Sequence, residues 1–246
     1  MPKKPRREET EQEFLARYDA GAFDHPSVAV DVVLLSAFDA ELWTVVVRRE
    51  EHPCRGRYAL PGVFVHIDES LDAAAQRALA EKTRVRRVFL EQLYTFGAPD
   101  RDPRTRVISV AYYALVPRER LPSGGKPVLA RVQVPWEGET GGAVELHAAG
   151  TELPLAFDHD EIVGMAVKRL RGKLDYTAVG FQLLPETFTL LDLQRVHEIV
   201  LRRPLNKDSF RRRMLASGEL EATGEAQRDV DHRPAELYRF VRRSAV

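Results

Sequence analysis

The sequence has 246 residues and a formal net charge of zero, with 44% hydrophobic and 30% charged residues. These values are ordinary for a globular protein of one large domain or two smaller ones. The single cysteine, Cys54, excludes a disulfide framework and a cysteine-rich zinc site. No apolar run reaches the length of a membrane span and no signal segment opens the chain, so we expect a cytoplasmic protein without a membrane partner.

Two strands are predicted after a tail and lead-in over residues 1–24, whose first part mixes charges of both signs. The β-branched run at 28–35 predicts a mostly buried strand, and 43–48 predicts a second, joined to the first by a polar turn. Three arginines follow: Arg48, Arg49 and Arg57. Their paired N–H groups are suited to grip a phosphate, and a solvated loop is the alternative for each.

A loop that enters a helix is predicted over residues 60–85. The helix opens where Asp68 or Ser70 can cap its free N–H groups, and alanine-rich sequence continues it. Three charged residues lie on neighbouring helical faces: Glu69, Arg77 and Glu81. A loop and helix that present carboxylates are suited to bind a diphosphate, with or without a divalent metal.

The residues up to 172 predict the rest of an α/β sandwich. Strands are expected at 89–96 and 107–116. The Gly- and Pro-rich stretch 122–154 predicts hairpins with long loops, and its glycines lack the spacing of a phosphate-binding P-loop. Helical periodicity, with acids in the first turn and bases in the last, predicts a helix at 160–171.

The C-terminal part predicts a packed connector, two helices and two short strands, at 173–186, 189–201, 206–217, 220–223 and 236–240. Tyr176 is among the connector residues expected to be buried. Thr189 and Asp192 form a capping box for the first helix. Asn206 caps the second helix and Gly218 ends it.

Helix, turn, basic helix and hairpin is the order of elements in a winged helix-turn-helix. Residues 194–213 contain seven basic residues and two acidic ones, and this local excess of positive charge is typical of a surface that binds nucleic acid. We expect the basic helix to enter the major groove, although a solvated helix face is the alternative for the arginine triplet taken alone. The predicted DNA-binding residues are Lys207, Ser209, Arg211, Arg212, Arg213, Arg228, His232 and Arg233.

The stretch 60–85 resembles the Nudix box, whose pattern is Gly, five residues, Glu, seven residues, Arg-Glu-aliphatic-any-Glu-Glu, any, Gly, aliphatic. The matching positions are Glu69, Arg77, Leu79, Glu81 and Val85, and the departures are Val63, Ala78, Lys82 and Arg84. In Nudix hydrolases the glutamates after the Arg bind the metal ions that activate water. Ala78 and Lys82 stand at two of those three positions. The resemblance therefore implies that the loop and helix of the box are retained and that its metal-dependent hydrolysis is lost.

From about 28 to 240 the chain resembles the NrtR family, the Nudix-related transcriptional regulators of NAD metabolism. The stretches that carry the resemblance are 94–117, 157–162, 173–198 and 204–215. The resemblance implies an α+β fold, in which an N-terminal Nudix-like α/β/α sandwich (25–172) and the connector precede a C-terminal winged helix-turn-helix domain (187–246). It also implies a homodimer that binds a palindromic operator in double-stranded DNA and usually represses genes of NAD synthesis or recycling.

A pocket that binds without cleaving is a sensor, and the resemblance implies ADP-ribose or NAD as the effector, with no required cofactor. The predicted effector-binding residues are Arg49, Arg57, Phe64, Glu69, Arg77, Glu81 and Lys82. The Lys82 ammonium is expected where a metal would sit, with a surface salt bridge as the alternative. Glu69, Arg77 and Glu81 either contact the ligand or brace the loop against the helix.

Two other functions stay open at this point. The first is an active Nudix hydrolase of ADP-ribose or another nucleoside diphosphate derivative, with an accessory DNA-binding domain. It requires Glu81 and carboxylates from elsewhere, such as Asp100 or Asp102, to hold magnesium. The second is a nucleic-acid-associated scaffold with a vestigial pocket.

Overall fold

A long central strand, β1 (Ser27–Phe38), organises the larger of two sheets. The computed structural model describes residues 9–174, 176–228 and 233–241, and within them this sheet has nine strands. Its main path runs β5 (Phe89–Phe96), β6 (Val107–Leu115), β1, β2 (Glu41–Arg48), β7 (Pro127–Gln133), β8 (Glu145–Ala148) and β9 (Thr151–Glu152); β3 (Tyr58–Ala59) pairs with β2, and β4 (Gly62–Phe64) with β1. β1 and β6 run parallel, whereas β1 and β2 are antiparallel.

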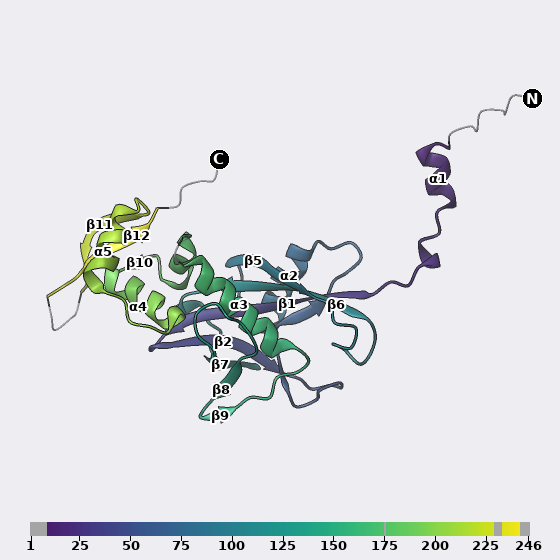
Figure 1. Ribbon diagram of the computed structural model, residues 1–246, viewed down its shortest axis with the longest axis horizontal. Coiled ribbons are helices and arrows are strands. Elements are labelled where there is room, and N and C mark those ends of the chain that lie inside the picture. The colour runs from purple at the N-terminus through teal and green to yellow at the C-terminus, as the bar shows by residue number, and fades with distance from the viewer. Residues whose placement is uncertain (1–8, 175, 229–232, 242–246) are drawn as a thin grey trace, which may run out of the picture.

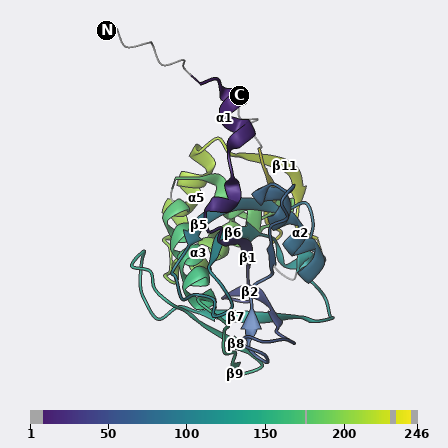
Figure 2. The same cartoon turned by 90° about the vertical axis from the view of Figure 1, so that its right-hand side faces the viewer.

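Two helices, α2 (Leu71–Thr83) and α3 (His159–Lys173), cover opposite sides of this sheet, as Figure 2 shows. Alternate residues of β1 point to the two faces: Val30 and Val32 belong to the apolar cluster under α2, and Val33 and Leu35 to the cluster under α3. Because both faces are covered, β1 is apolar almost throughout. The predicted α/β/α sandwich is confirmed.

The C-terminal segment forms a winged helix at one end of the molecule (Figure 1). Its elements are the 3-10 helix η3 (Ala178–Leu183), β10 (Thr187–Phe188), α4 (Leu190–Leu201), α5 (Lys207–Ala216), β11 (Leu220–Ala226) and β12 (Glu236–Phe240). The strands form a sheet in the order β10-β12-β11. The capping box of Thr189 and Asp192 begins α4, and the Asn206 side chain caps α5, both as predicted.

The core under α3 continues into the winged helix without a break, through buried residues such as Leu170, Phe181, Leu193 and Phe210. The connector is therefore packed, as predicted. The prediction that Tyr176 is buried is wrong, because its side chain is 74% exposed. The chain turns directly after α3, where the Tyr176 and Thr177 N–H groups donate to the Lys173 carbonyl, and the turn leaves Tyr176 on its outer side.

The N-terminal lead-in contains a short helix where the sequence predicted only a tail. Thr10 and Glu13 form a capping box that begins α1 (Glu11–Arg17), and the 3-10 helix η1 (Ala20–Ala22) follows. A third 3-10 helix, η2 (Arg118–Arg120), follows β6. α1 projects from the sheet at the end opposite to the winged helix (Figure 1). Within the described residues, no helix combines the length and the apolar character that a membrane crossing requires.

Candidate functional site

A pocket of about 920 Å³ opens beside the C-terminal end of α2. Its walls come from the end of β2, residues 59–62, the last turn of α2 and residues 120–127. Six cationic residues line it (Arg48, Arg49, Lys82, Arg84, Arg120 and Lys126) against three acidic ones (Glu50, Glu51 and Glu81). We call this site the basic pocket. Its excess of positive charge favours an anionic ligand.

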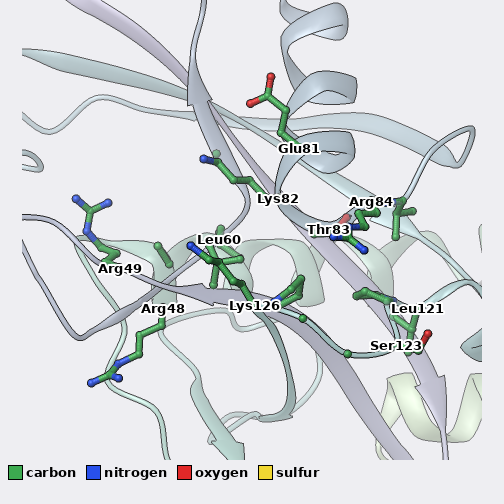
Figure 3. A pocket seen from close by; sticks show the side chains of 18 of the residues that line it. Arg48, Arg49, Leu60, Glu81, Lys82, Thr83, Arg84, Leu121, Ser123 and Lys126 are labelled. Carbon is green, nitrogen blue, oxygen red and sulfur yellow. Dashed lines mark hydrogen bonds between the residues drawn. The ribbon is translucent and has the colours of Figure 1, made fainter.

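Local sequence explains how α2 presents its last turn to the basic pocket. The Ser70 hydroxyl accepts a hydrogen bond from the Ala73 N–H and begins the helix, which ends at Arg84 in the left-handed conformation (φ 64°). The fully buried alanines Ala74, Ala75 and Ala78 face the sheet. Glu81 and Lys82 are thereby left on the open side and line the pocket, and Figure 3 shows Lys82 extending toward Arg49 while the Glu81 carboxylate points away from both.

Glu69 and Arg77 brace the loop against α2. Arg77 Nε and Nη2 donate to the two Glu69 carboxylate oxygens at 2.8 and 2.7 Å, and Nη2 also donates to the Phe64 carbonyl at 2.8 Å. The hydrogen bonds from the Arg77 guanidinium lower the pKa of Glu69 to about 2, and the Glu69 carboxylate raises the pKa of Arg77. A weaker ion pair, 3.7 Å, joins Arg77 to Glu81. These contacts support the bracing interpretation for the pair.

We expect the Glu69→Gln variant to lose an acid-sensitive part of the stability. The folded-state pKa of Glu69, about 2, lies below its ordinary 4.5, so the stabilisation is fully present above about pH 4.5 and disappears as the pH falls toward 2. Across that pH range, the midpoint temperature of thermal unfolding should fall more steeply for the parent protein than for Glu69→Gln. Glu152→Gln, which removes an exposed carboxylate, is the control. Parallel pH curves for the parent and Glu69→Gln would contradict the brace.

The structure brings three of the seven predicted effector residues into the basic pocket: Arg49, Glu81 and Lys82. Arg49 Nε donates to the Pro53 carbonyl at 2.8 Å. Outside the pocket lining, Arg57 donates to the Leu155 carbonyl and Phe64 lies under the Arg104 guanidinium. The pocket cations Arg84, Arg120 and Lys126 were missed, because they follow turns and loops that show no periodic pattern.

Sequence reasoning also missed a buried charge network behind the pocket wall. Arg101 binds Asp158 through two hydrogen bonds of 2.9 and 2.6 Å and lies 3.8 Å from Asp31, which accepts a 2.5 Å bond from Ser109. His159 Nδ1 accepts the Leu60 N–H at 2.9 Å, which leaves its proton on Nε2, 3.7 Å from Asp31. Burial lowers the pKa of His159 despite that carboxylate. The network therefore ties the start of α3 to the pocket wall.

The residues at the Nudix-box metal positions do not fit a divalent cation. Ala78 offers no ligand and is buried, Lys82 is a cation, and Glu81 pairs with Arg77. Asp102, one of the substitute ligands considered, is held instead by two bonds from the Arg104 guanidinium, which lowers the pKa of that carboxyl. Over the part of the chain that the structure describes, no three His, Cys, Asp or Glu side chains gather closely enough to hold a metal.

The winged helix exposes the predicted DNA-binding residues. Phe210 is buried against the His197 ring, while Lys207, Ser209, Arg211, Arg212 and Arg213 are exposed on α5. Glu198 accepts the Leu205 N–H at 2.8 Å and so fixes the turn between α4 and α5. Arg228 and Arg233 are exposed at the two ends of the hairpin loop, and His232 lies outside the described residues.

Comparison with known proteins covers both parts of the chain. Residues 180–240 match the family described as NrtR DNA-binding winged helix domain, and residues 25–162 match the NUDIX domain family. An ADPR responsive transcriptional repressor NtrR of Acinetobacter baylyi is 37% identical over 94% of this chain and 89% of its own length. An ADP-ribose pyrophosphatase of Methanocaldococcus jannaschii is 30% identical over 56% of this chain and 72% of its own. The structure of Shewanella oneidensis NrtR complexed with a 27mer DNA superposes with a TM-score of 0.73 at 36% identity, covering 87% of this chain and 93% of that one.

Proposed function

From the premise that this chain belongs to the NrtR family of Nudix-related transcriptional repressors, we propose that it is a DNA-binding repressor released from its operator by ADP-ribose or a related nucleotide. The winged helix binds DNA and the basic pocket receives the effector. The genes that it controls are those of NAD metabolism, and it acts in the cytoplasm, where a bacterial repressor meets its DNA.

The observation that carries the proposal is the pairing, in one chain, of an exposed cationic helix with a cationic pocket. α5 presents Arg211, Arg212 and Arg213 beyond a turn fixed in helix-turn-helix geometry. On α2, Lys82 in the pocket and the buried Ala78 stand at positions where a Nudix hydrolase has carboxylates. A site with these substitutions attracts a diphosphate and lacks the ligands for the metal that would activate water.

Lys82 is the central cation of this effector site. Its side chain extends into the basic pocket from the last turn of α2 (Figure 3). An ammonium there neutralises phosphate charge without generating a nucleophile, so binding is separated from cleavage. Glu69 and Arg77 contribute by bracing the loop, whereas Arg49 and Lys126 supply further positive charge.

The protein acts as a homodimer on a palindromic operator. Each chain supplies one recognition helix, and two half-sites about one helical turn apart need two such helices held at a fixed separation. The effector must bind the DNA-competent and the incompetent dimer with different affinity, because equal affinity would shift nothing.

The decisive experiment is a gel shift on the DNA upstream of the protein's own gene, with and without nucleotides. We expect salt-dependent binding that ADP-ribose or NAD reverses and that unrelated nucleotides leave intact. The absence of DNA binding, or binding indifferent to ADP-ribose and NAD, would refute the proposal.

A hydrolase is the second candidate, because the chain is similar to an ADP-ribose pyrophosphatase and retains Glu81. The same preparation should therefore be assayed for cleavage of ADP-ribose with magnesium and with manganese. Turnover at enzyme-like rates would favour this candidate over a sensor. We expect the purified protein to bind ADP-ribose without cleaving it at such rates.

A further inference from the structure

Two elements lead from the basic pocket to the joint with the winged helix. β7 begins at Pro127, which lines the pocket, and ends one residue before Val134. α3 begins at His159, which is bonded to Leu60 of the pocket wall, and ends beside α4. From the rise per residue, the strand and the helix each span roughly 20 Å.

At the far end of α3, the buried side chain of Arg171 reaches across to the winged helix. Its Nε donates to the Val200 carbonyl at 2.9 Å, and its Nη1 donates to the carbonyls of Gly138 at 2.9 Å and Trp136 at 3.4 Å. The guanidinium also lies 4.8 Å from the Trp136 ring centroid. Val200 is in the last turn of α4, where helix carbonyls lack partners within the helix and the helix dipole is negative. Arg171 therefore caps a helix of the other domain.

Arg202 makes the return contact from the winged helix. It ends α4 in the left-handed conformation (φ 53°), and its Nη1 donates to the Val134 carbonyl at 2.7 Å. We call Arg171, Arg202 and the four carbonyls that they bind the arginine clamp. The clamp joins α3, the segment that follows β7 and the end of α4.

The clamp is sensitive to the placement of its carbonyls. Within the described residues no carboxylate pairs with Arg171, so main-chain carbonyls and one ring compensate its buried charge. Burial and the neighbouring Arg202 lower the pKa of Arg171, which stays charged all the same. α3 also lies directly on the segment after β7: a methyl group at Gly164 would come within 1.8 Å of the Gly142 carbonyl oxygen. A shift of either element must therefore change the hydrogen bonds that hold α4.

We propose that the arginine clamp couples the basic pocket to the winged helix, with Arg171 and Arg202 as the positioning residues that convert pocket occupancy into a new orientation of α4. This inference rests on the proposed function, because it concerns how effector binding releases DNA. The β7 route ends at the carbonyls of Val134, Trp136 and Gly138, and the α3 route ends at Arg171, so both routes meet in the clamp and a rearrangement at the pocket reaches the winged helix through it.

The test compares full-length Arg171→Lys and Arg202→Ala with the parent protein. Lysine keeps the charge but has no planar fork to span three carbonyls and a ring. For each variant, ADP-ribose affinity is measured by calorimetry, and operator affinity is measured with and without saturating ADP-ribose. The ratio of the two operator dissociation constants is the coupling, typically 5–150-fold in allosteric proteins. We expect ADP-ribose affinity to stay within about twofold and the ratio to fall toward one.

Arg169→Lys is the matched control, because Arg169 lies on the same helix and donates to a carbonyl, that of Leu93, inside the Nudix-like domain. Its coupling ratio should equal that of the parent. Unchanged ratios in both clamp variants, or an equal loss in Arg169→Lys, would overturn the inference. If Arg171→Lys does not fold, Arg202→Ala decides alone, since Arg202 is an exposed residue. A parent protein that neither ADP-ribose nor NAD releases would instead refute the proposed function.

Discussion

Replacing Arg212 by alanine is expected to weaken operator binding strongly while leaving ADP-ribose affinity unchanged. Arg212 is exposed on α5, on the side opposite to the buried Phe210, so it faces the groove if α5 is the recognition helix. Loss of an arginine contact to a base edge costs about 1–3 kcal/mol, and a dimer loses two such contacts. Gel shifts over a range of salt concentrations, together with calorimetry for ADP-ribose, measure the two affinities.

Arg17→Ala is the control for this prediction, because it removes an exposed arginine from the N-terminal helix at the other end of the molecule. Its operator affinity should match that of the parent. If Arg212 contacts only phosphate, binding should weaken for all sequences and the salt dependence should decrease by about one charge. An unchanged gel shift for Arg212→Ala would contradict the assignment of α5 as the recognition helix.

Replacing Lys82 by glutamate is expected to raise, by about tenfold or more, the ADP-ribose concentration that is needed to release the operator. The change removes an attraction to the diphosphate and adds a repulsion. Because the pocket is open and Lys82 is exposed, solvent screens each effect to about 1 kcal/mol. Together they correspond to a loss of affinity of about tenfold or more. Calorimetric titration with ADP-ribose measures it, and operator binding without effector should be unaffected.

The matched control is Gln76→Glu, which adds a carboxylate to an exposed position of the same helix outside the basic pocket. It should bind ADP-ribose as the parent does. Equal losses of ADP-ribose affinity in the two variants would mean that the added negative charge, and not the position of Lys82, causes the loss. An unchanged titration for Lys82→Glu would show that Lys82 is not part of the effector site. If Lys82→Glu instead cleaved ADP-ribose in the presence of magnesium, the result would favour a hydrolase ancestry of the pocket.

Local patterns in the sequence predicted most of the elements. The alternation that sends Val32 and Val33 to opposite faces needs only the two-residue period of a strand. The caps at Thr189 and Asn206 are formed by residues within three positions of the helix start. α1 was missed although Thr10 and Glu13 form the same kind of box, because the charged residues before it resemble a tail.

The sequence by itself determined the two-part organisation, the exposure of Arg211 and Arg212 on a capped helix, and the loss of carboxylates at Ala78 and Lys82. Each of these depends on residue type at short spacing. Only the tertiary structure decided that Glu69 and Arg77 brace the loop and that the basic pocket gathers its cations from three separate segments.

The buried network and the arginine clamp also belong to the tertiary structure alone. Arg101 and Asp158 are 57 residues apart, Leu60 and His159 are 99 apart, and Arg171 is 29 residues from Val200. Neither helical nor strand periodicity reaches over such separations, so the partners of these charges are fixed by how the sheet, α3 and α4 pack. Local sequence sets which residues a helix exposes, whereas packing of distant elements sets which buried charge meets which carbonyl.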